Sequence, residues 1–349
     1  MWWINTALFV AGMAVFLDYR DWLGWNKHFF YKVAPGPCKY VSEDGGSEDL
    51  THVGNGLVIM TSGLYQGKGV GKIKSLNLNT SEVTTMKIAG APDREGFMDD
   101  PHGLSAWTDD NGETFVYVLT HPQSRDTIEV FKLRDNNTLK YKRTITDPMF
   151  TDMNDLVVVG KDKFFITMFR YYRGGYMQKF EMLARRPWGG VLYYDGSKAR
   201  QAASGLFLPN GINVSKDKKT VFVSELGAKT LIAYQRSPGN LLTKLWEKYS
   251  DTLVDNIEVD PDTGDLFIGC HPVLYRVFSF IFNVFDYPLP SQVLRYKMED
   301  NFISEIEEIY ADDGSELYGS TVGTYAMGKL VIGTVMRQTL VCDVNYLSP

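Results

Sequence analysis

The chain has little cysteine, and its three thiols lie far apart in the sequence. Cys38, Cys270 and Cys342 are the only cysteines among 349 residues. No two of them have the C-x-x-C spacing of structural zinc sites, so we expect no such site. Because three is an odd number, at most one disulfide forms within the chain and one thiol is left over.

The sequence also lacks an excess of basic residues. It has 36 Lys and Arg against 42 Asp and Glu, for a net charge of −6. Neutralising the phosphates of a nucleic acid needs a basic surface, so we expect no nucleic-acid partner. Hydrophobic residues make up 44% of the chain, which excludes a disordered protein. The 32 glycines and many alternating apolar runs favour β-structure.

Charge is absent from residues 2–17. As a helix this segment would span roughly 24 Å, less than the ~30 Å hydrocarbon core of a bilayer. It lacks the basic start and the A-x-A site of a cleaved signal peptide. We predict that residues 1–33 form an uncleaved signal-anchor or a helix lying on a membrane or lipid particle, ahead of one domain over residues 34–349. The alternative is a cleaved signal peptide or a buried helix.

Two signals disagree on which side of a membrane the body lies. The basic residues after the apolar segment, Arg20, Lys27 and Lys32, favour a cytoplasmic body. The N-x-S/T sequons, at Asn79, Asn136 and Asn213, favour a lumenal one. We expect the secretory pathway, with the body lumenal or extracellular (anchored at the endoplasmic reticulum or plasma membrane) or secreted. Asn79 and Asn136 lie in turn-like stretches and are the predicted glycosylation sites, whereas Asn213 lies in a predicted strand.

One pattern recurs six times: polar residues, a short apolar run, a turn rich in Gly, Asp, Asn or Lys, and a second apolar run. The copies begin at Glu48, His102, Asn154, Asn210, Asp255 and Ser320. Each is followed by a further strand pair, so each copy holds about four strands in ~50 residues. This arithmetic predicts an all-β, six-bladed β-propeller. A pair of β-sandwiches would not explain polar residues at the same phase of each copy.

The first strand of each propeller blade lines the central channel, so the residues just before these strands meet at one mouth. They are Glu48, Asp49, His102, Asn154, Asp155, Asn210, Asp255 and Asn256. Carboxylate and amide oxygens without thiolates suit a hard cation such as Ca²⁺. The alternative is that Asp and Asn only cap turns at strand starts, but this does not explain their shared phase in five copies.

A propeller must also close its ring. Cys38 precedes the first copy, and Cys342 ends the last apolar run. A disulfide between them would fasten the first and last strands of one blade. Closing so long a loop would be worth roughly 5–6 kcal/mol in the chain-entropy model. Such a bond would require an oxidising compartment.

Several motifs resemble those of the paraoxonase/arylesterase family. They are GSEDL (46–50), PHGLS (101–105), THP (120–122), MNDLVVVG (153–160), PNGINVS (209–215), LVDNIEVDPDTGDLFIGCHP (253–272) and GSTV (319–322). The resemblance runs from about Cys38 to Cys342. It implies a calcium-dependent lactonase or esterase on a six-bladed propeller, with the N-terminus kept as a membrane or lipoprotein anchor.

Residue by residue, the resemblance implies two calcium ions. It assigns the catalytic ion to Glu48, Asn154, Asn210, Asp255 and Asn256, and a structural ion to Asp49, Asp155 and the backbone carbonyl of Leu104. It implies that His102 and His121 activate water, although Asp255 could instead act as base or nucleophile. It also implies the Cys38–Cys342 disulfide and a free Cys270, which we expect to be a buried thiol and not a nucleophile.

Three segments need separate interpretation. Residues 167–170 (TMFR) replace the family's T-N-D-H with Phe169 and Arg170, and the loop at residues 65–70 is shorter than usual. Both changes could alter the range of substrates. The replacement at residues 167–170 could also lower the catalytic rate. Residues 171–188 form a predicted amphipathic lid helix on a membrane or an ordinary surface helix. Residues 277–285 are a predicted buried strand, or else a patch for a partner or membrane.

Two functions remain open. The first is calcium-dependent hydrolysis of lactones and aryl esters. The second is a non-catalytic, membrane-associated chaperone for other membrane proteins, as in some relatives. The altered 167–170 segment, the apolar run at residues 277–285 and the retained apolar N-terminus favour the second function. The complete ligand ring with both histidines favours the first.

Overall fold

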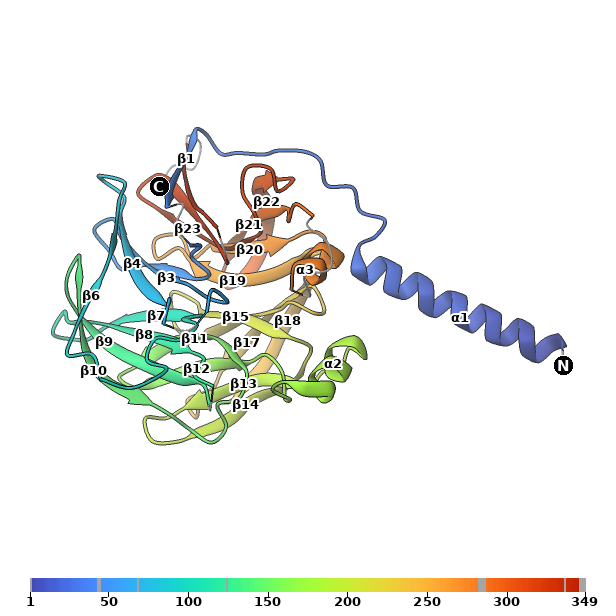
Figure 1. Ribbon diagram of the computed structural model, residues 1–349, viewed down its shortest axis with the longest axis horizontal. Helices are drawn as coiled ribbons and strands as arrows, with labels where there is room; N and C mark the ends of the chain where they lie inside the picture. The colour runs from blue at the N-terminus through green and yellow to red at the C-terminus, as the bar shows by residue number, and fades with distance from the viewer. Residues whose placement is uncertain are drawn as a thin grey trace.

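A computed structural model describes residues 2–42, 45–67, 69–123, 125–281, 287–335 and 337–344, with only the backbone for residues 2–8 and 281. The described strands form six sheets, whose innermost strands lie next to one another near the middle of the molecule (Figure 1). The predicted six-bladed propeller is confirmed. Each blade is an antiparallel sheet in which the first strand of the sequence repeat is innermost.

The first three blades follow the chain in order. Blade 1 contains β2 (Leu50–His52), β3 (Leu57–Ser62), β4 (Lys72–Asn77) and β5 (Glu82–Thr85). Blade 2 contains β7 (Leu104–Thr108), β8 (Thr114–Thr120), β9 (Thr127–Asp135) and β10 (Thr138–Ile145), with β6 (Lys87–Ala89) parallel to β10 at its outer edge. Blade 3 contains β11 (Met153–Gly160), β12 (Lys163–Met168), β13 (Gly189–Tyr194) and β14 (Ala199–Leu206).

The last three blades complete the ring. Blade 4 contains β15 (Pro209–Val214), β16 (Thr220–Glu225), β17 (Thr230–Arg236) and β18 (Leu242–Tyr249). Blade 5 contains β19 (Leu253–Val259), β20 (Leu266–His271), β21 (Ser291–Glu299) and β22 (Phe302–Asp312). Blade 6 contains β23 (Ser320–Ala326), β24 (Lys329–Thr334), β25 (Thr339–Asp343) and, from the other end of the chain, β1 (Cys38–Ser42).

The core is divided into apolar layers between neighbouring blades. Successive side chains of a strand point to opposite faces, so one strand serves two layers. In β16, Val221 and Val223 pack with Phe165 of blade 3, whereas Phe222 between them packs with Ile268 of blade 5. The alternating apolar runs of the sequence therefore fasten each blade to both of its neighbours.

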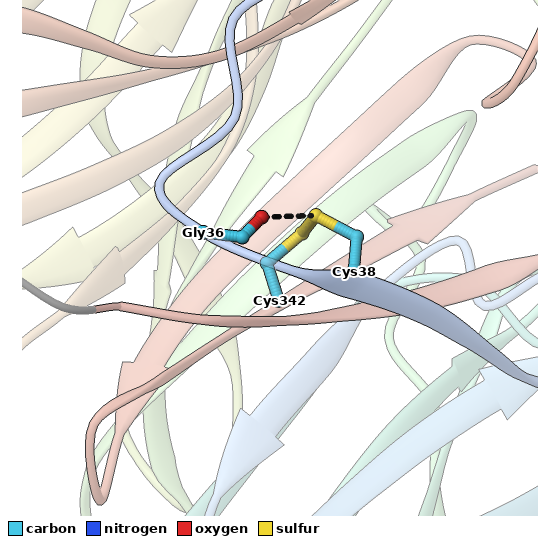
Figure 2. The surroundings of a disulfide bond; sticks show 3 residues. All are labelled: Gly36, Cys38 and Cys342. Carbon is cyan, nitrogen blue, oxygen red and sulfur yellow. Dashed lines mark hydrogen bonds between the residues drawn. A yellow bond between two sulfur atoms is a disulfide. The ribbon is translucent and has the colours of Figure 1, made fainter.

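The ring closes where the two ends of the chain meet. Strands β1 and β25 pair antiparallel with Cys38 opposite Cys342. The two cysteines, 304 positions apart in the sequence, form the disulfide shown in Figure 2. The predicted pairing is confirmed, and Cys270 is a buried free thiol as expected.

Three helices lie outside the blades: α1 (Trp2–Leu23), α2 (Gly175–Leu183) and α3 (Leu274–Ile281). Helix α2 confirms a helix within residues 171–188. The buried strand predicted for residues 277–285 is wrong, because residues 277–281 belong to α3, and residues 282–286 lie outside the described part of the chain. A short apolar run without alternation fits a helix as well as a strand, and here one face of the helix packs.

Helix α1 is docked at only one end. Trp22 packs against Phe207 and Phe278, and its indole Nε1 donates a hydrogen bond of 2.9 Å to the carbonyl of Gly227. The other end points away from the propeller (Figure 1). Along it Phe9, Val10 and Phe16 are exposed. In the described residues, we find no helix with the length and apolar character needed to cross a membrane.

Candidate metal centre and active site

Five buried carboxylate and amide oxygens on or just before the inner strands have no hydrogen-bond partner among the described residues. They are Glu48 Oε2, Asn154 Oδ1, Asn210 Oδ1, Asp255 Oδ1 and Asn256 Oδ1. Leaving a buried oxygen unpaired costs about 1–3 kcal/mol, so such a set calls for an explanation. These are the five side chains that the family resemblance assigns to the catalytic ion. A cation that accepts oxygen ligands would satisfy all five.

Direct contacts join several members of this set. Asn256 Nδ2 of blade 5 donates a hydrogen bond of 2.9 Å to Glu48 Oε1 of blade 1, past the intervening blade 6. Glu48 Oε1 in turn lies 3.4 Å from His102 Nε2 of blade 2. No three described His, Cys, Asp or Glu side chains gather as a metal-binding group, so a site here depends on the amide oxygens.

Hydrogen bonds between blades hold the backbone of these residues in place. The hydroxyl of Thr167 in β12 donates to the carbonyl of Asn210 (2.6 Å), and that of Ser224 in β16 donates to the carbonyl of Asp255 (2.5 Å). The hydroxyl of Thr321, from the sixth repeat, donates to the carbonyl of Glu48 (2.6 Å). Hydroxyl groups at the ends of strands thus position the candidate ligands of the next blade.

Two glycines allow the inner strands to approach. Gly103 and Gly211 each follow a Pro and a polar residue, in Pro101-His102-Gly103 and Pro209-Asn210-Gly211. A Cβ on Gly103 would lie 2.6 Å from the Cα of Asp155, and one on Gly211 would lie 2.5 Å from the carbonyl oxygen of Asp255. The backbone of one blade occupies the space that a side chain would need, so only glycine fits.

The two aspartates assigned to the structural ion are bonded differently. Asp49 accepts hydrogen bonds from the amides of Leu50 (2.9 Å) and Leu104 (2.7 Å). Asp155 accepts from the amides of Leu156 (2.6 Å) and Ile212 (2.8 Å). Each carboxylate therefore links its own blade to the next one. Both line a cavity of about 140 Å³ together with Leu104.

The electrostatics of this axis are unbalanced without a cation. Burial raises the pKa of Asp49 well above its usual range, and the charges of Asp155 and Glu48 add to the shift. Burial likewise raises the pKa of Asp255, although a hydrogen bond from His271 lowers it in part. A positive ion placed among these oxygens would oppose both effects, because it stabilises the ionised carboxylates.

The predicted histidine pair is in contact. His102 Nδ1 lies 2.8 Å from His121 Nε2, and His121 Nδ1 lies 2.8 Å from Asp126 Oδ1. Burial opposes protonation of His102, but the carboxylates of Glu48, Asp255 and Asp155 together outweigh it and raise the pKa of His102 above the ordinary 6.5. Asp126, whose other oxygen accepts from the amide of Met153, orients the second histidine.

Sequence reasoning missed Asp126 and His271. Arg173 also binds Asp126 (2.8 Å), and the bonds from His121 and Arg173 keep the pKa of Asp126 low against burial. His271 Nε2 lies 2.8 Å from Asp255 Oδ2 and so orients a candidate ligand. In the sequence, only the position of His271 beside Cys270 in the GCHP motif pointed to it. No sequence feature pointed to Asp126.

The remaining predicted positions are placed as follows. Arg170 pairs with Asp152 and lies over the ring of Phe169, 5.1 Å from the ring centre, so its charge is compensated. Burial raises the pKa of the Cys270 thiol, which keeps it protonated and unreactive. Asn79 and Asn136 lie in exposed turns. The Asn213 side chain donates to the carbonyl of Ile257 (2.8 Å).

Comparison with known proteins gives the family. A model of the arylesterase family matches residues 30–344. The chain is 37% identical to human serum paraoxonase/arylesterase 1, over 97% of this chain and 99% of that protein. It is 34% identical to human serum paraoxonase/lactonase 3, over 94% of each. The chain belongs to the arylesterase family. The predicted membership of an ester-hydrolysing family is confirmed, whereas the roles of individual residues stay predictions.

The fold of this arylesterase-family chain recurs in solved structures. A gluconolactonase-type protein is similar with a TM-score of 0.56 and 12% identity, over 91% of this chain and 94% of the other. A luciferin-regenerating enzyme is similar with a TM-score of 0.54 and 9% identity, over 89% and 94%. At these identities the likeness shows the fold alone.

We predict that Gly211→Ala destabilises the protein by roughly 1–3 kcal/mol, because the new Cβ would push the backbones of blades 4 and 5 apart. Urea unfolding measures this change. Gly160→Ala is the matched control, since the nearest atom to its Cβ would lie at 3.8 Å and its stability should barely change. Equal stability of the two variants would contradict the packing argument.

Proposed function

We propose that this protein hydrolyses lactones and aryl esters in a calcium-dependent reaction. The observation that carries the proposal is the set of five buried, unpaired oxygens next to a histidine pair. Binding alone would not call for a histidine relay beside a cation site. The human relatives named arylesterase and lactonase support the same substrate class.

In this proposal the chain binds two calcium ions. The first would be held by the five unpaired oxygens, which leave room for a substrate oxygen in a sphere of six to eight ligands. The second would be held by Asp49, Asp155 and the carbonyl of Leu104, which share one cavity. Because both aspartates already link blades, we assign the second ion a structural role and the first a catalytic one.

The chain's own residues would divide the chemistry among them. A bound calcium supplies Lewis-acid polarisation of the ester carbonyl. His102, buried beside Glu48, would accept a proton from water, and His121 would position His102 through the 2.8 Å contact between their rings. Asp126 would hold His121 in the required tautomer, while His271 would orient Asp255. Asp255 remains the alternative base.

Arg170 and Phe169 bear on the range of substrates. The stacked pair stands near the candidate active site, because Arg170 pairs with Asp152, two residues before the candidate ligand Asn154. A guanidinium and a ring occupy more space than the acidic residue and histidine that the family has there. We infer a narrower mouth and a substrate range that differs from that of the human relatives.

The calcium proposal predicts that chelation abolishes hydrolysis of phenyl acetate and of δ-lactones, and that calcium raises the melting temperature. Glu48→Gln should weaken calcium binding by about tenfold or more and lower kcat/KM at least ~100-fold, because one charged ligand is lost. In chelator, the same variant should be as stable as the unaltered protein, since it no longer buries an unpaired charge.

Glu82, an exposed carboxylate on β5, provides the matched control: Glu82→Gln should leave calcium affinity and kcat/KM unchanged. Calcium titration followed by calorimetry separates binding from activity. Hydrolysis that survives chelation would remove the metal mechanism.

The histidine proposal predicts a pH effect. The carboxylates that raise the pKa of His102 would be partly neutralised by a bound calcium, so the rise is opposed in the loaded enzyme. The base form of His102 is lost as the pH falls through its pKa, and activity should fall with it. His102→Gln should lower kcat about 100- to 10,000-fold and abolish this acidic limb of the pH profile. His28→Gln, at an exposed position, is the control. An unchanged limb in His102→Gln would assign the base elsewhere, with Asp255 the next candidate.

We also propose that the protein lies on a membrane or lipid surface through α1 and α2, within the secretory pathway. Exposed apolar side chains support this placement: Phe9, Val10, Val15 and Phe16 on α1, and Tyr176, Met177, Phe180 and Leu183 on α2. The disulfide supports an oxidising compartment. A chaperone for membrane proteins is the second candidate function, which calcium-loaded protein without esterase or lactonase activity would favour.

Replacing both Phe9 and Phe16 by Ser should lower binding to phosphatidylcholine vesicles at least about tenfold, since each buried phenyl ring contributes ~1.5–3 kcal/mol. Vesicle flotation measures this loss. Phe302→Ser, at a comparably exposed phenylalanine on β22, is the control. Equal flotation of both variants would show that α1 is not the contact.

A further inference from the structure

A second, larger cavity lies away from the propeller axis, between the docked end of α1 and blade 4. Its volume is about 810 Å³. Its walls include Trp22 of α1, Phe207 before β15, Tyr249 of β18 and Lys229 in the turn between β16 and β17. None of the candidate calcium ligands lines it, so it is distinct from the channel site.

Charged groups reach the cavity from every element around it. Arg185, after α2, pairs with Asp18 of α1. Lys27, after α1, pairs with Asp251 at 3.0 Å, and the Tyr249 hydroxyl donates to the same carboxylate (3.2 Å). Two of the three cations therefore have a carboxylate partner, and Asp21 completes the charged lining.

Lys229 differs from the other two cations. Its side chain lines the cavity, yet the residue is only 3% exposed. Within the described part of the chain its amine makes no hydrogen bond or ion pair. Its backbone is fixed, because its amide donates to the carbonyl of Leu226 (3.1 Å) in a tight turn. The residue is buried, and its amine, which has no acceptor among the described residues, opens onto a space large enough for a small molecule.

The surroundings favour the neutral, nucleophilic form of this amine. Burial, followed by the nearby charge of Lys27, lowers the pKa of Lys229 to about 8. The carboxylates of Asp251 and Asp21 raise this pKa but do not offset the two lowering effects. Desolvation and a neighbouring cation are the two conditions that make a lysine nucleophilic. The aromatic walls can hold a ring or an acyl chain.

We propose that Lys229 is an acylation site, at which the buried amine takes the acyl group of an activated aryl ester or a lactone that enters the cavity. The nitrogen forms a bond to the carbonyl carbon, and the carbon–oxygen bond of the ester or ring breaks. The amine proton passes to the departing oxygen, which leaves as the phenol or remains as the hydroxyl of the opened lactone. The product is an amide, and no other reactant is needed.

The reaction does not depend on hydrolysis at the channel, so it is tested with chelator present. Full-length protein is incubated with p-nitrophenyl acetate between pH 6 and 9.5, and acetylation of each lysine is followed by peptide mass mapping. Lys229 should be acetylated at least about tenfold faster than Lys219, an 81% exposed side chain in the same blade. The rate at Lys229 should be half-maximal near pH 8.

Matched variants make the result decisive. Lys229→Arg should lose this label and keep its fold, because the charge and most of the length are retained, whereas Lys219→Arg should leave labelling of Lys229 unchanged. In urea the two lysines should react at equal rates, which shows that the cavity causes the difference. A second incubation with δ-valerolactone should place the ring-opened adduct on Lys229 first.

Acetylation of Lys229 no faster than that of Lys219 in the folded protein would overturn the proposal, and so would a lactone adduct spread evenly over the exposed lysines. Either result would leave the calcium-dependent hydrolysis untouched. Conversely, selective labelling of protein that hydrolyses nothing would support the acylation site and contradict the proposed channel function.

Discussion

Buried negative charge on the propeller axis is the constraint on which the rest of this structure depends. Glu48 and Asp49 come directly before the inner strand of blade 1, Asp155 and Asp255 lie on the inner strands of blades 3 and 5, and all four are buried. Burying a carboxylate is costly unless it is paired. The blades can bring these groups together only because their apolar layers and the Cys38–Cys342 closure hold the ring. A cation bound among these carboxylates would therefore couple binding to folding, since it would offset a cost that the closed ring imposes.

The hydrogen bonds distinguish two kinds of acidic residue on this axis. Both oxygens of Asp49 and of Asp155 accept backbone amides, so these side chains join blades even without an ion. Glu48 and Asp255 each keep one oxygen that nothing in the described structure satisfies. An oxygen left unpaired at the centre of a well-packed fold is a stronger sign of a ligand than its residue type. The unpaired oxygens of Glu48 and Asp255 therefore indicate where a ligand would bind.

The sequence predicted the ring because each repeat contributes its polar residues at the same height on the axis. Residues at that phase, such as Asn154 and Asn210, could be identified without coordinates. His271 and Asp126 could not, since they stand outside the phase and reach Asp255 and His121 only through the fold. The segment that became α3 was predicted as a strand because an apolar run lacks the alternation that separates the two structures. The positions of His271 and Asp126 and the helical form of α3 depend on contacts between distant parts of the chain, which a local sequence pattern does not contain.

The N-terminal helix has exposed apolar side chains at one end and packs on the rest of the molecule at the other. Its docked end makes polar contacts with two separate parts of the molecule, the end of α2 and the turn between β16 and β17. Tyr19 donates to the carbonyl of Leu183 (2.6 Å), Trp22 to that of Gly227, and Asp18 pairs with Arg185. The Arg185 guanidinium also lies 4.6 Å from the centre of the Tyr19 ring. These contacts tie α1 to α2 and to the turn that carries Lys229. The cavity is built partly from the helix and the channel is not, so a displacement of α1 would change the cavity before it changed the channel site.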